Sequence, residues 1–147
     1  MKVGTLCVRQ TVMVEKSAPV TEAAKLMRDY HVGTLVVVDT LGERNRPVGI
    51  LTDRDIALRI VAEERSLQTP VSEVTDGELV TAGEEELLYD VLDRMKAYGI
   101  RRIPVVDDGG YLAGILSMDD IIEFLSDEMR EITSLFYKEA KQEQKHR

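Results

Sequence analysis

Two short motifs contain the residues best suited to chemistry. Thr52 and Asp55 stand three residues apart, and Ser117 and Asp120 repeat that spacing. Each pair lies between a run that predicts a strand and a run that predicts a helix, which places both pairs at a helix N-terminus. Free N–H groups there can bind phosphate, with the hydroxyl as a further donor, and the carboxylate can accept hydrogen bonds from ribose hydroxyls. The arrangement therefore suits a nucleoside phosphate.

The same motifs also fit a purely structural role. A hydroxyl followed three residues later by an acid resembles a helix-capping arrangement, and either motif taken alone favours a cap. Gly49 and Gly114 support the ligand interpretation, because each stands three residues ahead of the hydroxyl. A missing side chain there lets a ligand approach the backbone. On these residues alone, both interpretations stay open.

The motifs belong to an internal duplication. The sequence GILTDRDI at residues 49–56 returns as GILSMDDI at residues 114–121, with five of the eight positions identical. Asp39 and Asp107 are 68 residues apart, whereas the two motifs are 65 apart, so the first hairpin loop is three residues longer. A register that holds except at one loop indicates two copies of one unit.

Each copy reads as strand, helix, strand, strand and helix from its apolar periodicity. In the first copy these elements are expected at residues 11–14, 20–30, 32–39, 48–51 and 52–62, with a polar loop at 40–47. In the second copy they are expected at residues 79–81, 88–98, 100–107, 112–116 and from Ser117 onward, with a tight turn at 108–110. A unit of about 50 to 60 residues buries too little apolar surface alone. We therefore expect two sheets packed together in one α/β (α+β) fold.

The duplication also suggests domain boundaries. We divide the chain into a first repeat at residues 1–65, a linker at 66–74, a second repeat at 75–127, and a C-terminal helix extension and tail at 128–147. The last helix continues an apolar stripe beyond its repeat, through Ile121, Leu125, Met129, Ile132 and Phe136. Such a stripe needs a cover, so the helix either folds back on its own domain or forms a dimer contact.

Composition limits the classes of partner. The 147-residue chain carries a net charge of −8, which argues against binding duplex nucleic acid and against an anionic membrane surface. No stretch approaches the ~18 apolar residues of a membrane span, and the N-terminal apolar stretch is too short for a secretory signal. Cys7 is the only cysteine, so no intrachain disulfide forms. We therefore expect a cytoplasmic protein.

Catalytic residues and metal ligands are not expected. His31 and His146 lie far apart and without a cluster of cysteines or carboxylates, so a zinc site is not indicated. Ser117 lacks a Gly-x-Ser-x-Gly elbow and a nearby histidine base, so hydrolase chemistry finds no support. We therefore expect neither an enzyme activity nor a required cofactor.

The chain resembles a tandem pair of CBS domains, also called a Bateman module, over about residues 5–127. The resemblance rests on GILTDRD at 49–55, GILSMDD at 114–120, VGTLVVVD at 32–39 and IRRIPVVD at 100–107. It implies two β-α-β-β-α repeats packed sheet to sheet with pseudo-twofold symmetry, and two clefts that are each assembled from both repeats. It also implies a non-catalytic module that binds AMP, ADP, ATP or another adenosyl compound.

Carried over residue by residue, the resemblance implies a lining for each cleft. The first cleft would be lined by Thr52, Arg54, Asp55, Thr75, Val80, Ile100, Arg101 and Arg102. The second cleft would be lined by Ser117, Asp120, Val12, Val32, Gly33 and Thr34. The hydroxyls would contact phosphate, the carboxylates would contact ribose, and the apolar residues would contact adenine.

The two clefts are expected to differ. Arg101 and Arg102 add cationic donors to the first cleft, where Gly33 and Thr34 hold the matching places in the second. Charge-assisted hydrogen bonds to phosphate are strong, so phosphorylated ligands should bind more tightly in the first cleft. The alternative is that both arginines pair only with surface acids.

These inferences converge on a stand-alone sensor of an adenine nucleotide, acting as a homodimer on a separate regulated protein. A ligand that spans both repeats can transmit a signal only by binding one arrangement of the repeats better than another. The alternative is a structural or protein-interaction module with empty clefts, which dimerises and binds a partner through its C-terminal helix.

Overall fold

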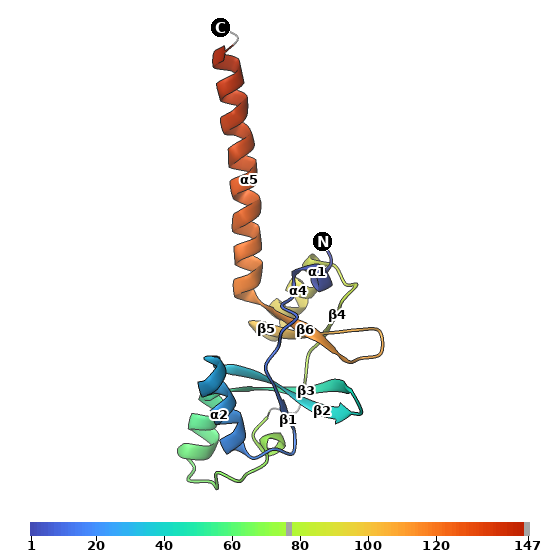
Figure 1. The fold of residues 1–147 in the computed structure, drawn as a ribbon, viewed down its shortest axis with the longest axis vertical. Coiled ribbons are helices and arrows are strands. Elements are labelled where there is room, and N and C mark those ends of the chain that lie inside the picture. The colour runs from blue at the N-terminus through green and yellow to red at the C-terminus, as the bar shows by residue number, and fades with distance from the viewer. Residues whose placement is uncertain (76–77, 146–147) are drawn as a thin grey trace.

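Two three-stranded sheets form the centre of the structure, a computed structural model that describes residues 1–75 and 78–145 (Figure 1). The first sheet contains β1 (Met13–Glu15), β2 (Thr34–Leu41) and β3 (Arg44–Thr52). The second sheet contains β4 (Ala82–Gly83), β5 (Arg102–Val106) and β6 (Leu112–Ser117). In each sheet the first strand runs parallel to the second, and the second runs antiparallel to the third.

Helices complete each repeat in the expected order. The first repeat has α2 (Val20–Tyr30) and α3 (Asp53–Ile56), which continues as the π-helical turn η1 (Ala57–Val61). The second repeat has α4 (Leu88–Tyr98) and α5 (Met118–Lys145). The equivalent strands β3 and β6 contact each other, so the two sheets meet around a pseudo-twofold axis. The predicted α/β (α+β) fold of two β-α-β-β-α repeats with a long C-terminal helix is confirmed.

The hairpin between β2 and β3 departs from the sequence prediction. The prediction of a polar loop at residues 40–47 is wrong, because both strands continue through this segment and leave only a tight turn at Gly42. Gly42 has φ +64, which glycine adopts without strain. Pro47 is tolerated inside β3 because it lies next to a register shift in the ladder. β1 begins two residues later than the strand predicted at 11–14. The strand predicted at 79–81 is wrong, because β4 begins only at Ala82.

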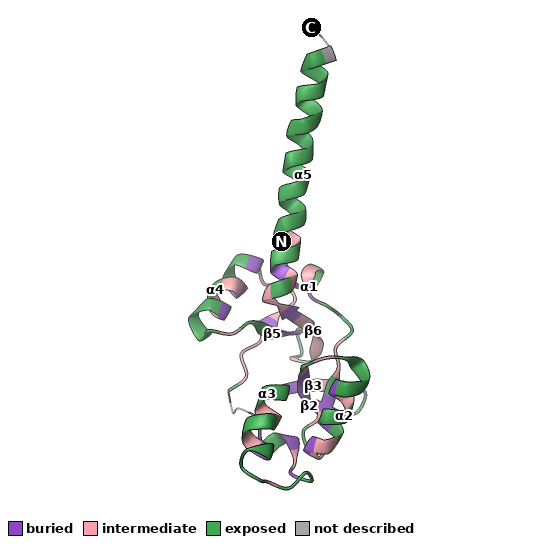
Figure 2. Cartoon of the chain, turned by 90° about the vertical axis from the view of Figure 1, so that its left-hand side faces the viewer, coloured by how far each residue is buried: buried purple, intermediate pink, exposed green. Residues whose placement is uncertain are grey.

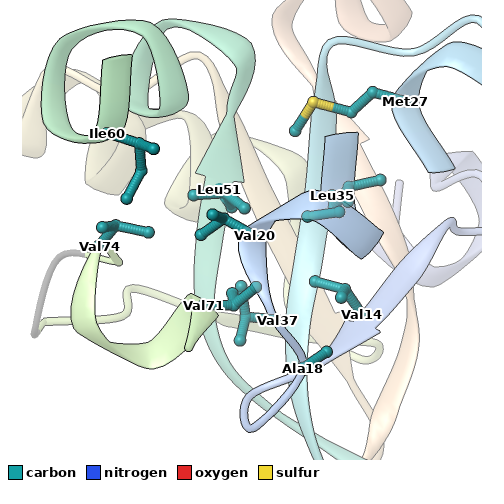
Figure 3. Close-up of a cluster of buried hydrophobic side chains, with 11 residues drawn as sticks. Val14, Ala18, Val20, Met27, Leu35, Val37, Leu51, Ile60, Val71 and Val74 are labelled. Atoms are coloured by element: carbon teal, nitrogen blue, oxygen red, sulfur yellow. The ribbon is translucent and has the colours of Figure 1, made fainter. Parts of the chain in front are cut away.

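The first hydrophobic core contains residues from outside the first repeat. Side chains such as Val14, Leu35 and Leu51 pack together between the sheet and the helices (Figure 3). Val71 and Val74 lie in the same core and are fully buried, although they belong to the segment that joins the repeats. That segment forms the 3₁₀ turn η2 (Val71–Glu73), and the Val71 N–H donates to the Ala18 carbonyl at 2.8 Å.

The second core is completed from the other end of the chain. The short helix α1 (Val3–Leu6) contacts β4 and β6, and Val3 and Cys7 are buried beside Leu116. Val3 and Val71 are 68 residues apart, which is the repeat offset. We call residues 3–7 and 71–74 the leading segments of the two repeats. The leading segment of each repeat therefore completes the core of the other repeat. This packing crosses the domain boundaries predicted at residues 65 and 74.

Glu86 anchors β4 to α4. Its carboxylate accepts hydrogen bonds from the Gly83 N–H at 2.7 Å and from Arg94 Nη1 at 2.9 Å. The hydrogen bond from the Arg94 guanidinium is the main cause that lowers the pKa of Glu86 to about 2. Burial opposes it, and the Gly83 N–H lowers the pKa further. The pair therefore stabilises the folded state while Glu86 is ionised.

We expect Glu86→Gln to lower the free energy of unfolding at neutral pH by about 1 kcal/mol, a figure reduced for the partial exposure of both side chains. The folded-state pKa lies below the ordinary glutamate value of ~4.3. The stabilisation is therefore complete above that value and is lost as the pH falls through about 2.

Melting curves of wild type and variant across this pH range check the prediction. The difference between their melting temperatures should disappear as the pH is lowered. Glu85→Gln is the matched control, because Glu85 pairs with Lys2 on the exposed surface. A gap that stays constant down to about pH 2 would contradict the assigned role of the Glu86 charge.

Candidate functional site

The first cleft lies between the two repeats and has a volume of about 320 Å³. Its lining from the first repeat is Thr34, Gly49, Ile50, Thr52 and Asp55. Its lining from the second repeat is Glu78, Leu79, Val80, Ile100, Arg101 and Arg102. A cleft of this size accommodates a small organic ligand. Six of the residues predicted for it therefore lie together, namely Thr52, Asp55, Val80, Ile100, Arg101 and Arg102.

Two residues predicted for the first cleft are not among the described residues that line it. The Thr75 hydroxyl donates instead to the Val71 carbonyl at 2.7 Å, within the segment that completes the first core. Arg54 has an exposed side chain at the start of α3, outside this lining. The sequence placed Arg54 by its proximity to Asp55, but neighbouring helical residues point in different directions.

The second cleft has a volume of about 370 Å³ and again draws on both repeats. It contains all six residues predicted for it, Val12, Val32, Gly33, Thr34, Ser117 and Asp120. Its remaining lining is Val8, Gln10, Thr11, His31, Val36, Arg102 and Ile115. At the equivalent positions, Thr11 of this cleft replaces Leu79 of the first, and Gly33 and Thr34 replace Arg101 and Arg102.

Thr11 is a lining residue that the sequence analysis missed. It lies 68 residues before Leu79 of the first cleft, and the sequence analysis missed both members of this equivalent pair. The Thr11 hydroxyl oxygen is buried and has no hydrogen-bond partner among the described residues. A buried hydroxyl in the cleft wall adds a polar position that a ligand can satisfy.

Both motifs form helix caps. In the first, the Thr52 N–H donates to Asp55 Oδ2 at 2.9 Å, and the Asp55 N–H donates to the Thr52 hydroxyl at 3.2 Å. In the second, both equivalent bonds are 3.1 Å long, between Ser117 and Asp120. The capping interpretation is therefore confirmed. Within the described residues these bonds engage Oδ2 of each carboxylate, so the caps fix the side chains and leave Oδ1 to accept from a ligand.

The two hydroxyls differ in one respect. The Ser117 hydroxyl donates to Asp120 Oδ2 at 2.8 Å, so its proton is already in use. Within the part of the chain that the structure describes, no such bond joins the Thr52 hydroxyl to Asp55. Thr52 can therefore donate to an anionic ligand without breaking an existing bond.

The two motif glycines serve different purposes. Gly49 lines the first cleft, in agreement with the sequence analysis. Gly114 does not make room for a ligand, because a Cβ there would lie 2.6 Å from the Val8 carbonyl oxygen and 2.9 Å from Cys7 Sγ. The absent side chain at Gly114 instead admits the N-terminal segment of the chain itself, and the interpretation based on the sequence is wrong at this position.

Strand pairing explains why some residues serve both clefts. Thr34 pairs with Thr52 across the first hairpin, and Arg102 pairs with Ser117 across the second. Since β3 and β6 meet at the centre, Thr34 and Arg102 line both clefts. The assignment of Arg102 to the first cleft alone is therefore wrong. Arg101 lines the first cleft but not the second among the described residues.

Within the described residues, the arginine pair has no charge partner. Neither the Arg101 nor the Arg102 guanidinium forms an ion pair or a side-chain hydrogen bond with the described residues. The alternative that both arginines pair with surface acids therefore finds no support in residues 1–75 and 78–145. Both side chains are exposed, so their donors can turn toward an anion in either cleft.

Among the residues described, no group of three or more His, Cys, Asp or Glu side chains could hold a metal ion. No helix in the same part of the chain is both long enough and apolar enough to cross a bilayer.

The CBS domain family model matches residues 3–62 and 71–127. The chain belongs to the CBS domain family. It is 42% identical over 112 residues to the CBS domain-containing protein YhcV of Bacillus subtilis, an alignment that covers 76% of each protein. The tandem pair of CBS domains predicted from the sequence is thus confirmed.

Solved CBS domain structures share the fold of this chain. A CBS domain protein of Pyrobaculum aerophilum, complexed with AMP, is 28% identical with a TM-score of 0.72, covering 82% of this chain and 89% of that one. The CBS domain pair of protein MJ0100, in complex with 5′-methylthioadenosine and S-adenosyl-L-methionine, is 27% identical with a TM-score of 0.73. That match covers 87% of this chain and 98% of the other.

Proposed function

We propose that this chain is a non-catalytic regulatory module that binds an adenine nucleotide, or a related adenosyl compound, in the clefts between its CBS repeats. The observation that carries the proposal is the position of Arg101 and Arg102, which line the first cleft and have no charge partner among the described residues. Such cations, in a chain of net charge −8, favour an anionic ligand.

The rest of the first cleft supports a nucleoside as the other part of the ligand. Ile50, Leu79, Val80 and Ile100 supply apolar walls on which a base can lie. The capped Asp55 carboxylate retains one oxygen for ribose hydroxyls, and the Thr52 hydroxyl can donate to phosphate. The AMP, 5′-methylthioadenosine and S-adenosyl-L-methionine of the similar solved structures all contain adenosine, which supports an adenosyl ligand as a class.

Sensing would follow from the way the clefts are built. Each cleft takes its lining from both repeats, so an occupant contacts both sheets at once. A ligand shifts the arrangement of the repeats only if it binds one arrangement better than another. We therefore place the signal in the relative position of the two sheets, with a separate protein as its receiver. No residue is assigned a catalytic role, and no cofactor is required.

Thermal unfolding tests the proposal. Binding to the folded state alone raises the free energy of unfolding by about 2.7 kcal/mol at a hundredfold excess of ligand over Kd. For a chain of this length we expect AMP, ADP, ATP or S-adenosylmethionine to raise the melting temperature by roughly 5–10 °C. Inorganic phosphate at matched ionic strength is the control. If none of these adenosyl ligands shifts the transition, the sensor proposal is wrong.

A second candidate function rests on α5. Its exposed apolar stripe favours a protein-interaction module that works with empty clefts, and the same melts distinguish the two, since this module responds to no nucleotide. The cytoplasmic location and the homodimer stay predictions under either function.

A further inference from the structure

The C-terminal helix leaves the body of the protein and exposes apolar side chains along its length. Only its first turns are anchored, with Ile121 buried and Phe124 packed against the second core. Beyond them α5 projects away from both repeats and is exposed (Figure 2). Leu125, Met129 and Phe136 are 48%, 65% and 65% exposed. The alternative in which this helix folds back on its own domain is therefore wrong.

Four of the exposed apolar side chains of α5 form one stripe. Leu125, Met129, Ile132 and Phe136 follow each other at spacings of four, three and four residues. This alternation is the spacing by which two helices pack along a shared seam. The order of spacings is the same when it is read from either end. Two copies of the stripe laid side by side in opposite directions therefore match layer by layer, with Leu125 beside Phe136 and Met129 beside Ile132.

Charge along α5 selects between the two possible directions. Residues 118–131 contain six acids and one arginine, a net charge of −5. Residues 132–145 contain three lysines and two glutamates, a net charge of +1. A parallel pair would set the two acidic halves side by side, whereas an antiparallel pair sets each acidic half beside the slightly basic one. Like charges disfavour the first arrangement and complementary fields favour the second.

We propose that α5 forms an antiparallel pair with α5 of a second copy of this chain. The symmetric stripe is complementary to itself, so a second copy covers it on both partners at once. The two bodies then lie at opposite ends of the helix pair. This inference depends on α5 alone and stands or falls independently of nucleotide binding.

Sedimentation of the full chain gives the first test. The mass should be at least twice the 16.5 kDa of one chain, and Met129→Glu should halve it by placing carboxylates inside the seam. Ser134→Glu is the matched control, because it adds the same charge to an exposed position on the opposite face of the helix. A wild-type mass of one chain, or an unchanged mass for Met129→Glu, overturns the proposal. Circular dichroism of each variant shows that the helix itself remains folded.

Cysteine cross-linking tests the direction. An equal mixture of Leu125→Cys and Phe136→Cys proteins should form disulfide-linked dimers, whereas either variant alone should form several-fold fewer. Wild type is the control for Cys7, which is buried. Efficient linkage of Leu125→Cys to itself indicates a parallel pair and overturns the antiparallel proposal.

Discussion

Arg102→Ala is expected to weaken AMP binding about tenfold or more at both clefts, because it removes charge-assisted hydrogen bonds worth about 1.5–3 kcal/mol. Arg102, the first residue of β5, pairs with Ser117 and lines both clefts, so one guanidinium serves two sites. Titration calorimetry of wild type and variant measures the affinity and the number of sites. The effect should grow from AMP to ATP as the ligand carries more charge.

Two matched variants separate this effect from a general loss of positive charge. Arg101→Ala should weaken the first cleft only, since Arg101 lines that cleft and not the second among the described residues. Arg54→Ala removes an equal charge from outside the described lining of either cleft and should leave both affinities unchanged. If Arg102→Ala spares one cleft, the shared role drawn from strand pairing is incorrect.

Gly114→Ala is expected to lower the free energy of unfolding by about 3 kcal/mol, at the upper end of ordinary overpacking. The new Cβ would meet the Val8 carbonyl oxygen at 2.6 Å, a backbone atom that cannot move alone. Val8 and Ile115 also exchange two backbone hydrogen bonds, at 2.9 and 3.0 Å, which the displaced segment would lose. For a chain of this length the melting temperature should fall by roughly 10 °C.

Gly83→Ala is the control for this substitution. A Cβ at Gly83 meets only the Glu86 side chain, at 3.7 Å, which is an ordinary contact. A second readout is the reaction of Cys7 with a thiol reagent, because burial protects this thiol and raises its pKa. Labelling should accelerate in Gly114→Ala and not in Gly83→Ala. Equal melting temperatures and labelling rates for the two variants would contradict the packing of the N-terminal segment on β6.

The sequence predicts the repeated fold well because the two copies share one apolar pattern, so the elements assigned in one copy support those assigned in the other. Strands 34–41 and 102–106 and helices 20–30 and 88–98 lie at the positions that the shared apolar pattern indicates. The loop prediction at 40–47 fails because polar residues and Pro47 also suit an exposed hairpin with a register shift. Neither composition nor periodicity reveals that distant segments complete each core. An apolar residue such as Val3 or Val71 is recognisable as a core candidate, but its type does not indicate which core it joins.

In the candidate site, too, some residues could be predicted from the sequence and others could not. Residues fixed by the repeated motif, such as Thr52 and Asp120, lie in the clefts because strand and helix positions determine them. Thr75 turns toward its own backbone, and Gly114 faces the N-terminal segment. The Thr75 bond is local, to a residue four positions earlier, whereas the Gly114 contact joins segments far apart in sequence, which local spacing does not encode. Arg102 reaches the second cleft for the same reason, through its pairing with Ser117.

The exchange of leading segments also governs the order in which the chain can fold during synthesis. The first core closes once Val74 has left the ribosome, which is half-way through translation. Val3 and Cys7 emerge at the very beginning, yet the strand that covers them ends at Ser117. The nascent chain therefore carries an uncovered apolar N-terminus for most of its synthesis, a state that chaperones recognise and that aggregates when translation stalls.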